Sequence, residues 1–174
     1  MLKKDREAFA LFASGDPSQI ARAIAYFQSL EPGHFDDHPL SRKMVAENLG
    51  VLVDLWHSNR VPGTRDWVVQ FVADAQLASE LTKPLVATAL LDPSCAFLPT
   101  VLYLMGTRPA LFADLGVPLT ALATHSDPEV RWRVAWFISK VPRLDADLAA
   151  AVALLERDTH ATTQVYVRAC RAKA

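Results

Sequence analysis

Residues 126–142, with the sequence SDPEVRWRVAWFISKVP, carry the clearest structural signals in this chain. They predict one helix with well-defined ends. Ser126 and Asp127 both favour the N-cap position, and Pro128 suits the first turn, where a missing N–H group costs nothing. Pro142 ends the helix, because the residue before a proline avoids the α-helical region.

One apolar stripe runs along this helix, and two tryptophans lie away from it. The stripe recurs at three- and four-residue steps, which is typical of a buried helix face, and comprises Val130, Val134, Phe137, Ile138 and Val141. At about 100° per residue, Trp132 and Trp136 fall nearly opposite the stripe, beside Arg133 and Lys140. Two interpretations stay open. Either a second layer of helices covers both indoles, or the indoles form an exposed anchor for a partner.

The same stretch resembles a HEAT-type helical repeat. The family pattern of an Asp, a Val-Arg pair, a small residue and an aliphatic residue is matched here by Asp127, Val130, Arg131, Ala135 and Ile138. The resemblance covers one unit of about 35 residues and is faint elsewhere. It implies that Asp127 and Arg131 tie neighbouring repeats together.

An Asp-Pro helix start recurs along the chain at Asp16, Asp92 and Asp127. The last two are 35 residues apart (127 minus 92), a spacing typical of helical-hairpin repeats, and the first lies about two periods earlier. Helical periodicity dominates, and no run of alternating β-branched residues predicts a strand. We therefore predict an all-α fold: a short right-handed α-solenoid of stacked antiparallel helix pairs, HEAT-like, in one domain over residues 1–174.

The segments between these starts predict nine to ten helices in all. Residues 41–57 read as the longest uninterrupted helix, and residues 64–79 as a helix capped by Thr64. Pro99 is too far from Asp92 for one regular helix, so the first turn there is expected to be separate or kinked. The last helix, over residues 161–172, is expected to place Val165, Val167 and Cys170 partly inside.

Composition narrows the classes of function. The net charge of −1 argues against a non-specific nucleic-acid binder, which usually has a basic surplus. Two cysteines are too few for a disulfide framework and predict reduced, buried thiols in a cytoplasmic protein. No eighteen apolar residues run together, and the N-terminal segment reads as an amphipathic helix rather than a signal peptide, so no membrane partner is expected.

Candidate catalytic and metal-binding groups are weakly supported by their spacing. The loop sequence EPGHFDDH at residues 31–38 combines histidines and carboxylates, but it matches no metal motif and is also typical of a polar loop. Asp54 and His57 are one turn apart, with no nucleophile placed beside them. Cys95 follows a helix start, where a thiol pKa is lowered, but a core thiol is the simpler interpretation. We therefore predict no catalytic residue, no metal and no cofactor.

A binding surface is the remaining prediction. Trp and Arg dominate binding hot spots, because they combine a large apolar area with directional donors. The predicted partner-binding residues are Trp132, Arg133, Trp136, Lys140, Asp36 and Asp37, the last two facing a basic partner unless they belong to a solvated loop.

The resemblance and the residues together support three hypotheses on function. Small HEAT-like proteins are similar to immunity proteins that bind a bacterial toxin domain, such as a nuclease domain, and block its active site. HEAT-like DNA glycosylases place tryptophans and an Asp in a basic groove, but that Asp has no assignable counterpart here. A regulatory or lyase-like HEAT protein acting on a tetrapyrrole-bearing partner rests on fold analogy alone. The first hypothesis, a non-catalytic immunity protein, is the prediction.

Overall fold

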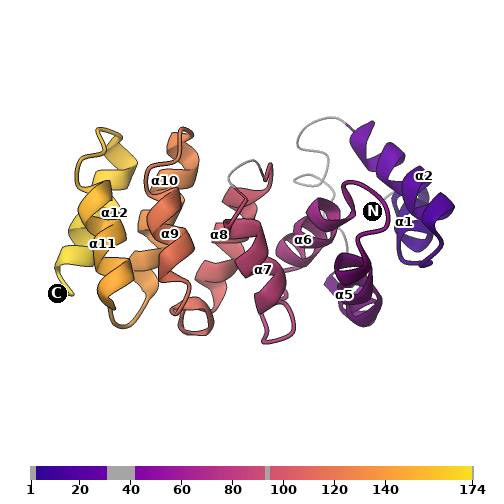
Figure 1. Cartoon of the computed structure of the whole chain (residues 1–174), viewed down its shortest axis with the longest axis horizontal. Coiled ribbons are helices and arrows are strands. Elements are labelled where there is room, and N and C mark those ends of the chain that lie inside the picture. Colours follow the sequence, from indigo (N-terminus) through magenta and orange to yellow (C-terminus); the bar gives the residue numbers. More distant parts are fainter. Residues whose placement is uncertain (1–2, 31–41, 93–94, 174) are drawn as a thin grey trace. The chain divides into compact units, whose positions relative to one another are not determined.

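The computed structural model describes residues 3–30, 42–92 and 95–173 (Figure 1). Within these ranges every regular element is helical, with eleven α-helices and one 3₁₀ helix, which confirms the all-α prediction. Asp36 and Asp37, with the rest of the loop at 31–38, lie outside the described residues. The chain divides into two compact units, Met1–Leu77 and Ala78–Ala174.

The first unit contains five described helices. They are α1 (Lys3–Phe12), α2 (Pro17–Gln28), α4 (Arg42–Glu47), α5 (Leu49–Ser58) and α6 (Thr64–Asp74). Helix α1 packs along α2, and α6 contacts α2, α4 and α5. The predicted cap of α2 is confirmed: Asp16 Oδ1 accepts from the backbone N–H groups of Ser18 and Gln19 at 2.8 and 3.0 Å.

Buried phenylalanines form the core of the first unit. Phe71 of α6 is fully buried, and three phenylalanines meet it edge to face at centroid distances of 5.0–5.3 Å; these are Phe9, Phe12 and Phe27. This geometry sets the positive edge of one ring against the negative face of the next. Beside this cluster Tyr26 donates to Asp5 at 2.6 Å, and burial together with this bond raises the pKa of Tyr26 to about 12.

Two helix predictions in the first unit were wrong. Residues 41–57 are not one helix, because the chain breaks at Asn48, whose side-chain amide donates to the carbonyl of Met44 at 2.8 Å. Such a local bond competes with the helical ladder. Helix α6 ends at Asp74 rather than near residue 79, since Gln76 adopts a left-handed φ of 55°. Thr64 does not cap this helix, and its hydroxyl donates instead to the carbonyl of Val61.

The second unit is built from six α-helices and a 3₁₀ turn. They are α7 (Lys83–Leu90), α8 (Leu98–Thr107), η1 (Pro109–Phe112), α9 (Gly116–Leu122), α10 (Pro128–Lys140), α11 (Ala146–Leu155) and α12 (Ala161–Arg171). Helices α8 and α12 both pack against α10, and α9 contacts both α7 and α11 (Figure 1). The second unit therefore has two layers, the α8–α10–α12 layer and the α7–α9–α11 layer.

Helix α10 confirms the central sequence prediction. All five members of its apolar stripe are at most 2% exposed. Asp127 is the N-cap residue and accepts from the backbone N–H of Glu129 at 2.8 Å, while the helix ends at Lys140, just before Pro142. The separate start of α8 is confirmed as well, because α8 begins at Leu98 and Pro99 sits in its first turn.

In α12 the predicted interior is correct only in part. Val167 and Cys170 are buried, but Val165 is 52% exposed and was wrongly placed inside. Helix α12 packs on α10 and α11, and Val165 lies on a side of it that faces solvent. A periodic pattern alone does not reveal which sides of a helix its neighbours cover.

Candidate protein-binding face

Helix α10 carries the four predicted binding residues that the structure describes. Trp132, Arg133 and Trp136 are partly exposed, and Lys140 is exposed. The two open interpretations of the indoles are therefore both incomplete. Neighbouring helices of the same layer flank each indole, no second layer among the described residues covers it, and part of each ring system remains accessible.

Trp136 lies on α8. Its indole is stacked on the ring of Tyr103, with centroids 5.7 Å apart and planes within 5° of each other. Lys140 Nζ stands 4.7 Å from the centroid of the same indole, within the range of a cation–π contact. Gly106 makes room for the ring, because a Cβ at this position would lie 2.2 Å from Cη2 of Trp136.

Trp132 faces the other neighbouring helix, α12. Its indole is stacked on Tyr166, with centroids 6.2 Å apart and an interplanar angle of 22°. The guanidinium carbon of Arg133 lies 4.7 Å from the centroid of this indole, and Arg133 Nη2 also donates to Glu129 at 2.9 Å. Both indoles thus have one aromatic ring and one cation against them.

These contacts define one surface that spans three helices. We call it the aromatic–cation face, and it comprises Tyr103, Trp132, Arg133, Trp136, Lys140 and Tyr166. The two tyrosines were missed by the sequence analysis. A 35-residue alignment sets Val101 against Trp136, but Val101 is fully buried, and the ring that meets Trp136 is that of Tyr103, which is 43% exposed. No spacing along α10 points to either tyrosine, because their contacts come from the packing of α8 and α12 against α10.

Arg131 holds the N-terminal end of α10 to the loop before α12. Its guanidinium donates to Asp158 through Nε at 2.8 Å and Nη2 at 3.3 Å, and through Nη1 to the carbonyls of His125 and Ser126. The Arg131 hydrogen bonds hold the pKa of Asp158 at about 2, although burial opposes this shift. Arg131 thus joins the start of α10 to the loop before α12, whereas Asp127 bonds to the first turn of its own helix.

The seam between α10 and α12 is closed by contacts near the chain's end. The thiol of Cys170 donates to the carbonyl of Ala135 at 3.7 Å, and Lys173 Nζ donates to the carbonyls of Ser139 and Val141. Burial raises the pKa of Cys170 to about 11, so this thiol stays protonated and unreactive at neutral pH. Cys95 is buried too, which agrees with the prediction of core thiols.

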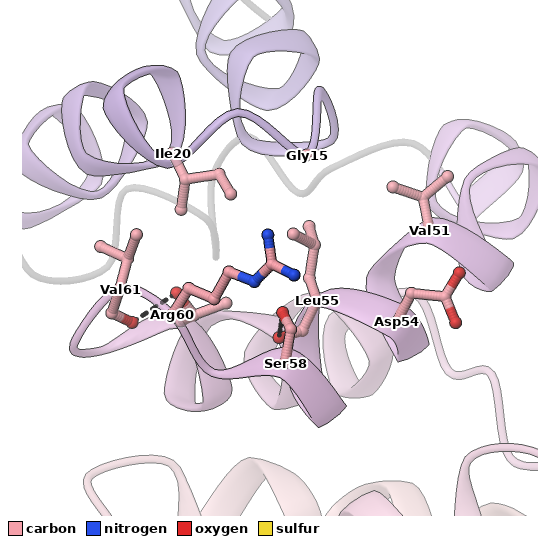
Figure 2. A pocket seen from close by; sticks show the side chains of 9 residues that line it. Gly15, Ile20, Val51, Asp54, Leu55, Ser58, Arg60 and Val61 are labelled. Atoms are coloured by element: carbon pink, nitrogen blue, oxygen red, sulfur yellow. Dashed lines mark hydrogen bonds between the residues drawn. The ribbon is translucent and has the colours of Figure 1, made fainter.

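A separate pocket of about 260 Å³ lies in the first unit (Figure 2). Ile20, Leu55 and Val61 supply apolar walls, while Asp54 and Arg60 bring opposite charges to it. Ser58 also lines the pocket, and its hydroxyl group donates to the carbonyl of Leu55. The pocket is therefore amphipathic, and the hydroxyl groups of Ser58 and Thr64 in its lining both donate to backbone carbonyls.

A larger hollow of about 550 Å³ lies on the α7–α9–α11 layer of the second unit. Its lining comprises Leu90, Leu91, Pro118, Ala121, Leu122, Thr124, His125 and Ser126, with no Asp, Glu, Lys or Arg side chain. It thus differs from the aromatic–cation face, which combines rings with charges.

Comparison with known proteins assigns this chain to no class, so its description rests on the structure. No protein-family model, curated protein or solved structure matched this chain. The described residues contain no group of three or more His, Cys, Asp or Glu side chains placed to hold a metal ion, and none of the helices described is long and apolar enough to cross a membrane. The molecule is an all-α protein with an aromatic–cation face on one helix layer.

Proposed function

We propose that this chain is a non-catalytic protein-binding module and that the aromatic–cation face is its binding surface. The proposal rests on one observation: four aromatic rings from three helices are paired and left partly accessible on a single layer. Rings already held by stacking lose little conformational freedom on binding, and Trp, Tyr and Arg are the residue types that dominate interface energies.

The fold proposed to carry this surface is a short right-handed α-solenoid of HEAT-like helix pairs in one domain. Two features of the second unit support it. Its even-numbered helices lie in one layer and its odd-numbered helices in the other, as in stacked pairs. In addition, Arg131 links α10 to the loop before α12 by the bidentate ion pair with Asp158, as expected for a residue that joins neighbouring repeats.

The specific role we propose is that of a cytoplasmic immunity protein that binds and neutralises a cognate bacterial toxin domain. Inhibition by such a protein requires surface complementarity and no chemistry of its own. The unreactive Cys170 thiol and the partly exposed hot-spot residue types agree with this role.

The alternative, a HEAT-like DNA glycosylase or another nucleic-acid binder, is less well supported. A base that stacks on a protein needs a free ring face. Here Tyr103 and Lys140 lie against Trp136, while Tyr166 and Arg133 lie against Trp132. The third hypothesis, action on a tetrapyrrole-bearing partner, gains no support from any contact described above.

Co-purification with the C-terminal toxin domain encoded by a neighbouring gene tests the proposal. We expect a one-to-one complex by size-exclusion chromatography with light scattering. Trp132→Phe and Trp136→Phe should each weaken it at least about tenfold, because hot-spot rings contribute that much or more. Trp67→Phe is the matched control, since Trp67 is a partly exposed indole of the first unit. A complex that tolerates both changes on the face would contradict the proposed site.

A further inference from the structure

Charge on the aromatic–cation face is of one dominant sign. Helix α8 contributes no charged residue to this layer. On and beside the rings lie two cations, Arg133 and Lys140, and one carboxylate, that of Glu129, which leaves a formal charge of +1. The whole chain has a net charge of −1, so this face is basic in a slightly acidic protein.

The cations of this face are not all neutralised by the protein itself. Glu129 is half exposed and pairs with Arg133 at 2.9 Å, four residues along the same helix. Lys140, in the last turn of α10, makes no ion pair with any residue that the structure describes, and its ammonium group lies over the indole of Trp136. An i,i+4 pair with a half-exposed carboxylate contributes little stability, so a partner's carboxylate can take the place of Glu129 at Arg133.

Along α10, the indole of Trp136 lies between the cations Arg133 and Lys140. Arg133 and Lys140 are seven residues apart on α10, which places them about two turns apart on the same side of the helix, with Trp136 between them. A chain segment along α10 would therefore meet a cation, an indole and a second cation in turn.

We infer that the aromatic–cation face binds an acidic segment of a partner protein, in which carboxylates alternate with apolar side chains. The carboxylates pair with Arg133 and Lys140, and the apolar side chains pack on the accessible parts of Trp136 and Trp132. The inference rests on the proposed binding function and adds the chemistry of the partner. It differs from the expectation attached to Asp36 and Asp37, which would face a basic partner.

A nucleic acid would also bring negative charge, but the observations favour a protein. Phosphate contacts alone carry affinity in proportion to the number of cations engaged, and this face offers few. Stacking would have to supply the rest, and each indole already has a ring and a cation against it.

Three probes of matched length test the inference with the full-length protein. The first is a 14-residue fluorescein-labelled peptide that alternates Glu with Leu and Phe, the second has Lys in place of each Glu, and the third is a labelled oligothymidylate. Fluorescence anisotropy at low salt should show binding of the acidic peptide only. Because the attraction is between partly exposed charges, its affinity should fall severalfold between 50 and 300 mM NaCl.

Charge reversal locates the site. The double variant R133E/K140E should weaken the acidic peptide at least about tenfold. The control K3E/K43E makes the same change in net charge at two highly exposed lysines of the first unit, each paired with a glutamate four residues along its own helix, and it should leave the affinity within about twofold, since neither lysine belongs to the face. Circular dichroism and thermal unfolding of both variants establish that they fold.

Several results would overturn the inference: equal binding of the basic peptide, tighter binding of the oligothymidylate, no binding of the acidic peptide, or equal weakening by K3E/K43E. Failure of the inference and failure of the proposed function are distinguishable. If the toxin domain is captured and is weakened by Trp132→Phe but not by R133E/K140E, the binding face stands and its acidic partner does not. If neither variant affects capture, the face itself is wrong.

Discussion

The phenylalanines at the centre of the first unit are buried and meet edge to face, whereas the two tryptophans of helix α10 in the second unit stack on tyrosines at the surface. Phe71 is surrounded by three other phenylalanines and is fully buried. Trp132 and Trp136 each stack on one tyrosine and stay partly exposed. Rings in the first arrangement contribute to folding, because their whole area leaves water. Rings in the stacked arrangement leave part of their area accessible to solvent, where a partner can bind.

The second difference between the units is how closely neighbouring residues approach their glycines. In the second unit, Gly106 and Gly116 permit close approach, because a Cβ at Gly106 would overlap the Trp136 ring and one at Gly116 would lie 2.5 Å from Cβ of Asp147. In the first unit, Gly50 has no atom within 4 Å of the position where a Cβ would lie. Helix packing in the second unit thus depends on missing side chains as well as on those present.

The largest expected effect comes from truncating the ring at the centre of the first unit. Phe71→Ala should destabilise the protein by about 3–5 kcal/mol, since it removes a fully buried ring and leaves a cavity. Trp136→Ala, at a partly exposed ring, should cost about 1–2 kcal/mol. Urea unfolding followed by circular dichroism measures both. Equal costs would remove the distinction between a folding cluster and a binding face.

Removing the ion pair between Arg131 and Asp158 should give the second largest loss of stability, and this loss should depend on pH. Asp158→Asn should cost roughly 2 kcal/mol at pH 7, because the carboxyl pKa falls from 3.8 to about 2 on folding. A pKa lowered by folding means that the stabilisation is fully present above about pH 4 and is lost as the pH falls towards 2.

Unfolding curves for wild type and Asp158→Asn between pH 2 and 7 measure this difference. The two stabilities should converge at the acid end of the series. A difference that stays constant down to pH 2 would mean that Asp158 acts through packing rather than through its charge.

A single added methyl group tests how Trp136 is seated. Gly106→Ala should destabilise the second unit by about 1–3 kcal/mol or turn the indole outward, because the new Cβ overlaps the ring. The intrinsic fluorescence of Trp136 should change in either case. Gly50→Ala is the matched control, which should be neutral or stabilising by up to about 1 kcal/mol, since Ala favours a helix more than Gly does. Wild-type spectra and stability for Gly106→Ala would contradict the close approach.

The smallest expected effect is at Val165, on the solvent side of α12. Val165→Thr should change the free energy of unfolding by less than about 0.5 kcal/mol, as is usual at exposed positions. Val167→Thr, two residues along and buried, should cost about 1–3 kcal/mol, because it places a hydroxyl group in an apolar environment. Thermal unfolding of both variants distinguishes the two sides of the helix, and a reversed order would support the original placement of Val165.

The sequence by itself determined the all-α class, the ends of α10 and its buried stripe. These features depend on local chemistry: an Asp that accepts from the first turn, prolines at both ends, and apolar residues at helical spacing. The candidate site was half predictable, because the same spacing placed Trp132 and Trp136 away from the stripe. The break at Asn48 was missed, since its bond to Met44 competes with a helical pattern that continues through it.

Only the tertiary structure decided what surrounds the two tryptophans. Tyr103 and Tyr166 lie on α8 and α12, and they reach the indoles through packing against α10 that periodicity within one helix does not encode. The same holds for Gly106, whose missing side chain is recognisable only beside the ring it admits. Local sequence determines which side of a helix is apolar, whereas the neighbouring helices determine how much of a ring remains accessible for binding.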